Sequence, residues 1–204
     1  MRSKWSAPIL SIQRETVFVH DLTAITPLGG QTPVVETIGP ITLTEVTDRA
    51  LASVTARQGR LTEAAQVLET VLGAALPDTQ RCIDQPLGAF WAAPDQWMIE
   101  APISSHEDLA HQLMAAANGT FSVTEQTDAW CRFDLAGDGL ADLFERLCPA
   151  PVRAFQGGEA VRSTIDHLGC FVICRTPTRI SVLGPRSSAG SLHHALITAM
   201  RSVY

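Results

Sequence analysis

The segment GAFWAAPDQWMIEA, residues 88–101, predicts a β-hairpin. Apolar residues run through both arms, and the pair Pro94-Asp95 lies between them. This pair is typical of a turn, because proline presets φ at the first central position of a β-turn. We therefore expect two antiparallel strands over 88–93 and 96–101.

Three tryptophans stand in or near this hairpin. Trp91 and Trp97 lie in its two strands, and Trp130 opens a later extended segment. An indole ring can simply fill a core. Tryptophan is also typical of the few residues that dominate protein–protein contacts, so we predict these three as candidate partner-interface residues.

Segments with helical periodicity lie on both sides of the hairpin. Apolar residues spaced three and four apart predict four helices, over 61–72, 104–117, 140–147 and 192–203. We expect Ser104 and Glu107 to form a capping box at the start of the second helix. Asp138 is the expected N-cap of the third.

Extended segments between these helices complete the pattern, with turns expected at 168–169 and 177–178. They cover 41–46, 51–56, 120–127, 130–136, 161–167, 170–175 and 179–183. Together with the helices they predict an α+β fold of antiparallel sheets with helices packed on them, built as two βαββαβ-like (ferredoxin-like) halves. Residues 1–40, rich in Thr, Pro and Gly, are expected to form an arm or long hairpin, and residues 41–204 a single domain.

Composition excludes several classes of protein. The 204 residues are 46% hydrophobic and 18% charged, unlike a disordered chain, and the net charge of −6 without a basic cluster predicts no nucleic-acid partner. No strictly apolar run exceeds five residues, so we expect no membrane span and no signal peptide. Five cysteines without a CxxC motif suit free thiols in the cytoplasm. Of the 15 basic residues 14 are arginine, which fits either GC-rich coding or a partner-binding surface.

Three motifs point towards chemistry, and each is incomplete. GDGLAD at 137–142 follows a strand as a dinucleotide-binding turn would, but Asp142 replaces its third glycine and opposes a pyrophosphate. HEDLAH at 106–111 misses the zinc-binding HExxH spacing by one residue, and the adjacent histidines at 193–194 diverge by about 100° on a helix. We therefore predict no catalytic, cofactor-binding or metal-ligating residue in this chain.

Several segments, taken in order, carry a family resemblance. They are LASVTARQG at 51–59, GAALP at 73–77, FWAAPDQWMI at 90–99, VTEQTDAW at 123–130, DLAG at 134–137 and 143–149. This series resembles the gamma subunit of heterotetrameric sarcosine oxidase over about residues 41–204. That family shares its fold with the N-terminal part of the glycine-cleavage T-protein and with the TrmE N-terminal domain. The hairpin is the most specific segment, although Ala93 stands where the family usually has glycine.

The resemblance implies an accessory, non-catalytic subunit of an oxidoreductase complex. Such a complex oxidatively demethylates sarcosine to glycine, with formation of hydrogen peroxide and methylenetetrahydrofolate. The implied partners are the larger alpha and beta subunits and a small delta subunit, which are expected to hold FAD, FMN, NAD and tetrahydrofolate, with no cofactor on this chain. Two alternatives remain: a self-sufficient tetrahydrofolate-binding, aminomethyltransferase-like protein, and the gamma-type subunit of a complex acting on another N-methyl amino acid such as N-methylglutamate.

Overall fold

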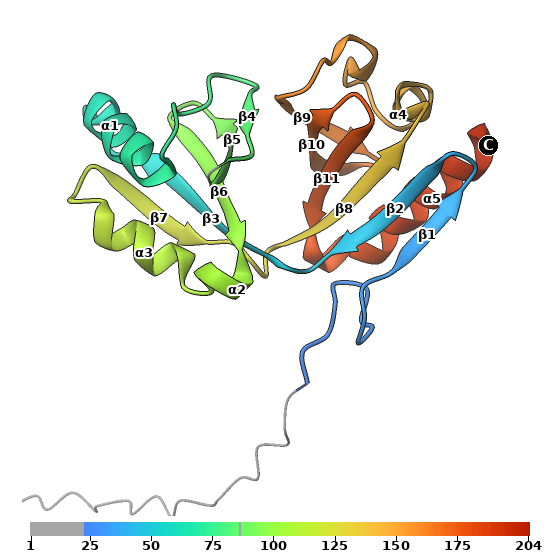
Figure 1. Ribbon diagram of the computed structural model, residues 1–204, viewed down its shortest axis with the longest axis horizontal. Helices are drawn as coiled ribbons and strands as arrows, with labels where there is room; N and C mark the ends of the chain where they lie inside the picture. The colour runs from blue at the N-terminus through green and yellow to red at the C-terminus, as the bar shows by residue number, and fades with distance from the viewer. Residues whose placement is uncertain (1–22, 86) are drawn as a thin grey trace, which may run out of the picture.

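Two antiparallel β-sheets lie side by side and carry their helices on the faces turned away from each other (Figure 1). The structure is a computed structural model and describes residues 23–85 and 87–204. Each sheet forms one core with its helices, and a third core fills the space between the sheets. This arrangement confirms the predicted α+β class. None of the helices in the described ranges is long and apolar enough to cross a membrane.

The five-stranded sheet is a ferredoxin-like half formed by consecutive residues. Its strand order is β4-β5-β6-β3-β7, with α1 and α3 packed on one face. Because α1 buries Ala64, Leu68 and Leu72 on one stripe, its apolar spacing places it against this sheet. The elements are β3 (Arg49–Ala56), α1 (Leu61–Leu72), β4 (Cys82–Ile83), β5 (Gly88–Ala93), β6 (Gln96–Pro102), α2 (Ile103–His106), α3 (Leu109–Ala116) and β7 (Phe121–Glu125).

The six-stranded sheet is assembled from both ends of the chain, in the order β1-β2-β8-β11-β10-β9. It does not repeat the first half in sequence order. The place beside β8 belongs to the N-terminal strand β2, whereas the corresponding place beside β3 in the first half belongs to β7, the last strand of that half. Leu43 pairs with Leu135 there, and both are fully buried against the helices of this sheet. The elements are β1 (Val35–Ile38), β2 (Ile41–Val46), β8 (Trp130–Gly137), α4 (Leu140–Leu147), β9 (Glu159–Ile165), β10 (Leu168–Thr176), β11 (Arg179–Pro185) and α5 (Ala189–Val203).

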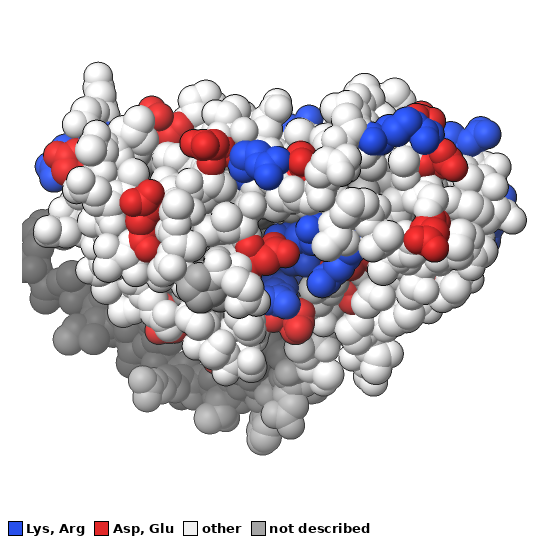
Figure 2. Space-filling view, turned by 45° about the horizontal axis from the view of Figure 1, so that its top comes forward, with Lys and Arg blue, Asp and Glu red and all other residues white. Residues whose placement is uncertain are grey.

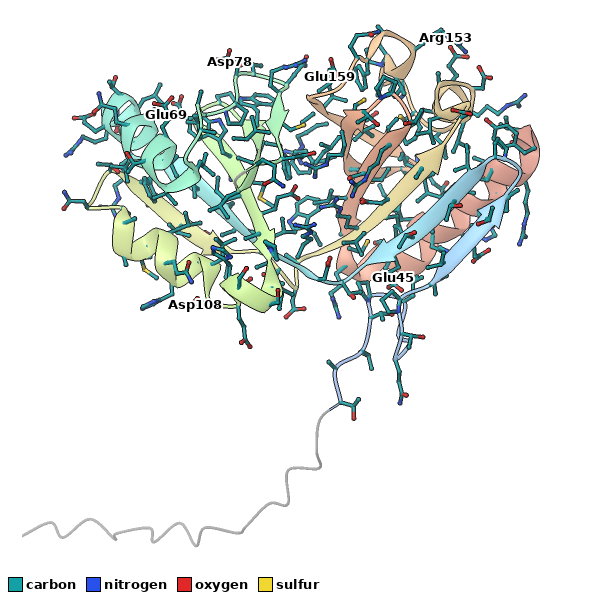
Figure 3. The ribbon with its side chains drawn as sticks, in the orientation of Figure 1. Glu45, Glu69, Asp78, Asp108, Arg153 and Glu159 are labelled. Atoms are coloured by element: carbon teal, nitrogen blue, oxygen red, sulfur yellow. The ribbon has the colours of Figure 1, made fainter. Side chains whose placement is uncertain are left out.

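The segment before β2 joins this second sheet. β1 pairs with β2 as a hairpin, so the last residues of the predicted arm are part of the sheet, while residues 1–22 lie outside the described ranges. Glu45 of β2 is buried, and its carboxylate accepts hydrogen bonds from the backbone N–H of Leu28 (2.9 Å) and Val34 (3.0 Å) (Figure 3). One carboxylate therefore holds the loop before β1 against the sheet.

Two predicted helix caps are wrong. Neither α2 nor α3 has a side-chain cap, because the segment after β6 makes one turn, breaks, and starts α3 in the phase that buries Leu109 and Leu113. The N-cap of α4 is Gly139 rather than Asp138. Gly139 adopts φ 86°, and its carbonyl accepts a 2.9 Å hydrogen bond from the Tyr204 hydroxyl.

The turn expected at 168–169 is also displaced. Leu168 and Gly169 pair with β9 inside β10, and the chain reverses at Asp166-His167 instead. Both of these residues have positive φ, 46° and 66°, as a two-residue hairpin turn of the primed type requires. The Pro94-Asp95 turn and the hairpin around it are confirmed.

Candidate functional site

Charged side chains from both sheets are buried where the sheets face each other. Figure 2 shows basic and acidic groups gathered in the hollow between the two halves of the molecule. The central member is Arg132 of β8, whose side chain is 7% exposed. Its neighbours Cys131 and Phe133 point into the helix-side core, so strand alternation turns Arg132 towards the other sheet.

Arg132 makes four hydrogen bonds within this cluster. Its Nε and Nη2 donate to the two carboxylate oxygens of Asp134 at 2.7 and 3.0 Å, a bidentate pair along one face of β8. Its Nη1 donates to Glu100 Oε2 across the sheets at 3.0 Å, and Nη2 also reaches Ser181 Oγ at 3.0 Å. The guanidinium therefore connects β8, β11 and β6.

Arg175 of β10 forms the second crossing between the sheets. Its side chain is 3% exposed, and Nη2 lies 2.7 Å from Glu100 Oε1, an ion pair outside hydrogen-bond geometry. Nη1 donates to Asp84, and Nε donates to Ser181 Oγ at 3.2 Å. Glu100 thus receives one arginine on each carboxylate oxygen.

The cluster is electrostatically balanced. Burial acts to raise the pKa of Asp134, but the hydrogen bonds and charge of Arg132, with Ser181 and Arg179, outweigh burial and hold that pKa below its usual value. Burial acts to lower the pKa of Arg175, and the charges of Glu100 and Asp84 outweigh it and raise that pKa. Every carboxylate of the cluster faces an arginine, so the cluster joins the two halves rather than offering a free acid or base.

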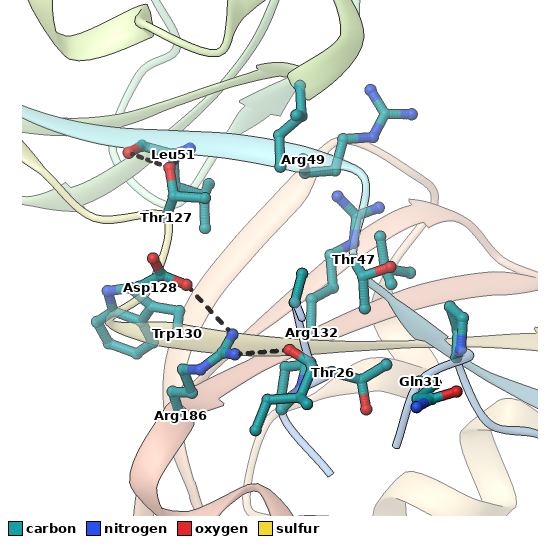
Figure 4. Close-up of a pocket in the computed structure, with 16 residues that line it drawn as sticks. Thr26, Gln31, Thr47, Arg49, Leu51, Thr127, Asp128, Trp130, Arg132 and Arg186 are labelled. Atoms are coloured by element: carbon teal, nitrogen blue, oxygen red, sulfur yellow. Dashed lines mark hydrogen bonds and ion pairs between the residues drawn. The ribbon is translucent and has the colours of Figure 1, made fainter. Parts of the chain in front are cut away.

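A pocket lies beside this cluster (Figure 4). It is lined by loop 24–33 and by the two segments through which the chain passes from one sheet to the other, 46–51 and 127–132. Its volume is about 280 Å³. Arg49, Arg132 and Arg186 line it, together with an apolar wall that includes Leu51 and Trp130. It meets the buried charges at Arg132.

The three predicted interface tryptophans occupy different environments. Trp97 is buried in the core under α1, and its Nε1 donates to the Pro77 carbonyl at 2.9 Å. Trp91 is half-buried at the edge of the same core. Trp130 is half-buried between the sheets, and the centroid of its ring lies 5.3 Å from that of Phe171. A partner contact stays a prediction for all three, and Trp91 and Trp130 offer more surface for it than Trp97.

The incomplete motifs do not assemble into a site. His106 and His111 lie on separate short helices. His193 Nε2 lies 3.2 Å from Glu36 Oε1, whereas His194 is exposed. Over residues 23–85 and 87–204, no group of three His, Cys, Asp or Glu side chains is placed to hold a metal ion.

The sequence interpretation missed the buried charge cluster. Its signal is the segment CRFDLA at 131–136, in which the charged residues Arg132 and Asp134 alternate with apolar residues. Glu100 stands likewise inside the apolar run of β6. When a charged residue stands between buried apolar residues of a strand, its side chain is itself buried and requires an oppositely charged partner, which can come from another strand.

The fold is shared with proteins of known structure. A chain of the heterotetrameric sarcosine oxidase from Corynebacterium sp. U-96, solved in complex with pyrrole 2-carboxylate, superposes with a TM-score of 0.72 at 20% identity. The match covers 82% of this chain and 87% of that chain. This likeness defines the class as an α+β protein with the fold of a sarcosine oxidase chain.

A second protein has the same fold within a longer chain. The glycine cleavage system aminomethyltransferase T from Bartonella henselae matches with a TM-score of 0.59 and 17% identity, over 79% of this chain and 46% of that one. This chain therefore spans about half of the aminomethyltransferase. No protein-family model matches the sequence, and no curated protein matches it.

Proposed function

We propose that this chain is an accessory, gamma-type subunit of a sarcosine oxidase complex. The observation that carries the proposal is the shared fold over 82% of this chain and 87% of a chain from a heterotetrameric sarcosine oxidase. The match extends along most of both chains, whereas the aminomethyltransferase is covered only to 46%. These coverages favour a chain equivalent to the whole sarcosine oxidase chain over a complete aminomethyltransferase.

The chemistry of the buried cluster agrees with a supporting role. Glu100 forms ion pairs with Arg132 and with Arg175, and these pairs join the two sheets. We propose that the oxidative demethylation takes place on larger alpha and beta subunits, which would hold FAD, FMN, NAD and tetrahydrofolate, with a small delta subunit completing a cytoplasmic complex. On this proposal the present chain binds no cofactor and contributes contact surface.

Coexpression tests the proposal. The tagged chain is produced alone and together with the alpha, beta and delta subunits of a heterotetrameric sarcosine oxidase from the same source. Alone, it should show no flavin absorption and no oxidase activity. Together, it should copurify with the flavin-bearing chains and with sarcosine-dependent hydrogen peroxide formation. Failure of the chain to associate with them would sink the proposal.

The fold shared with an aminomethyltransferase supports one alternative. A self-sufficient tetrahydrofolate-binding protein would bind tetrahydrofolate saturably as the isolated chain, and a flat calorimetric titration would remove this possibility. If the complex forms but is inactive on sarcosine, activity on N-methylglutamate and other N-methyl amino acids would identify a related complex. The substrate would then be a property of the partner chains.

A further inference from the structure

The pocket beside loop 24–33 has walls of two different kinds. One wall is apolar and includes Leu51, Ile103 and Trp130. The other carries guanidinium groups from three separate elements, those of Arg49, Arg132 and Arg186. In Figure 4 the guanidinium of Arg186 reaches from one side between Asp128 and the loop at Thr26, and that of Arg132 lies beside Thr47. With a volume of about 280 Å³ the pocket suits a small organic molecule.

Hydrogen-bond donors exceed acceptors at the basic wall. Arg49 Nε is buried without a hydrogen-bond partner among residues 23–85 and 87–204, and the carboxylate of Asp48 is 3.6 Å away. A guanidinium has five N–H groups, and the four hydrogen bonds of Arg132 leave one Nη1 N–H over. A buried donor without an acceptor costs free energy, so this wall favours a ligand that brings an acceptor with it.

Negative charge at the pocket is sparse. Of the described residues that line the pocket, Asp128 is the one with an acidic side chain, and that side chain is 86% exposed. It lies 3.4 Å from Arg186 Nη1, and Arg186 Nη2 also donates to the Ile25 carbonyl at 3.1 Å. Asp134 and Glu100 are not among the lining residues and are occupied by the buried arginines. Arg132 is thus already neutralised, whereas Arg49 and Arg186 have the carboxylates of Asp48 and Asp128 at 3.6 Å and 3.4 Å.

The geometry points to a binding site for a small carboxylate-bearing molecule in this pocket. Its carboxylate accepts hydrogen bonds from Arg49 Nε and the remaining Arg132 N–H, beside Arg186. Its apolar body lies against Leu51 and Trp130. Planar guanidinium groups match carboxylate geometry, and the apolar wall favours an organic acid over an inorganic anion. This site is independent of the proposed subunit role.

Calorimetry on the full chain tests the site with acetate, benzoate and glutarate as probes. At least one of them should bind saturably with one molecule per chain. Benzamide, which has the shape of benzoate without its charge, should give no saturable heat. Arg49→Gln and Arg186→Gln should each weaken binding by about tenfold, the effect of losing one hydrogen bond to a charged group. Arg57→Gln, which removes the same charge at an exposed position outside the pocket, should leave binding unchanged.

Two results would overturn the site. One is the absence of saturable binding by all three carboxylates at millimolar concentrations. The other is unchanged affinity in both Arg49→Gln and Arg186→Gln, since the ligand would then lie elsewhere. Far-ultraviolet circular dichroism and thermal unfolding establish that each variant is folded. Arg186→Gln also removes the hydrogen bond to the Ile25 carbonyl, which holds the loop, so Arg49→Gln tests the site without this change.

Discussion

Gly88 lies directly against the side chain of Glu100. A Cβ placed on Gly88 would stand 2.3 Å from Glu100 Cγ and 2.7 Å from its Oε1. These two residues pair across β5 and β6, so the absence of a side chain at position 88 leaves the space in which Glu100 meets Arg132 and Arg175. One glycine therefore makes room for the carboxylate that links the two sheets.

We expect Gly88→Ala to lower the free energy of unfolding by about 2–4 kcal/mol, because it combines overpacking with displacement of a buried carboxylate from its arginines. Urea unfolding followed by circular dichroism measures this loss. Gly169→Ala is the matched control, since Gly169 also lies in a strand but nothing stands within 4 Å of its Cβ position. Equal stability of the two variants would show that the contact with Glu100 is not what constrains position 88.

Asp134→Asn should destabilise the protein most at neutral pH. The pKa of Asp134 lies below its usual 3.8 in the folded chain, so its stabilising contribution is present above pH 3.8 and is lost as the pH falls through the lower folded pKa. We expect a loss of about 2–4 kcal/mol at pH 7, shrinking below pH 3.8. Unfolding curves at several pH values give the comparison, and a loss independent of pH would contradict the linkage.

Cysteine reactivity should be concentrated at one position. Burial raises the pKa of Cys82 to about 12 and those of Cys131, Cys170 and Cys174 to about 11, whereas Cys148 is half-buried. Because the thiolate is the reactive form, iodoacetamide at pH 8 should label Cys148 first and the other four only after unfolding. Mass spectrometry of the timed reaction tests this, and the Cys148→Ser variant should show no fast labelling.

Trp91→Ala should weaken binding to partner subunits. If the half-buried Trp91 is a dominant contact residue, its truncation should raise the Kd by roughly thirtyfold, equivalent to about 2 kcal/mol. Pull-down titration against the coexpressed larger subunits measures the change. Met114→Ala is the control, because Met114 is 58% exposed on α3 and was not predicted to contact a partner. Unchanged binding by Trp91→Ala would remove Trp91 from the interface.

Local patterns predicted the elements well where local geometry dominates. The 88–101 hairpin is confirmed because proline at Pro94 restricts its own φ and so acts wherever the hairpin lies. The stripe of α1 is confirmed because its apolar residues face one side in any packing. The reversal at Asp166-His167 was missed, since two adjacent positive φ values there depend on the pairing of β9 with β10.

The sequence by itself determined the α+β class, the ferredoxin-like half around the 88–101 hairpin and the positions of most strands and helices, because these depend on periodicity and turn residues close together in the chain. Only the tertiary structure decided that β2 completes the second sheet and that Arg132 meets Glu100, 32 residues away. Both depend on which strands become neighbours when apolar faces are buried. A buried arginine, moreover, requires a carboxylate whose position no local pattern specifies.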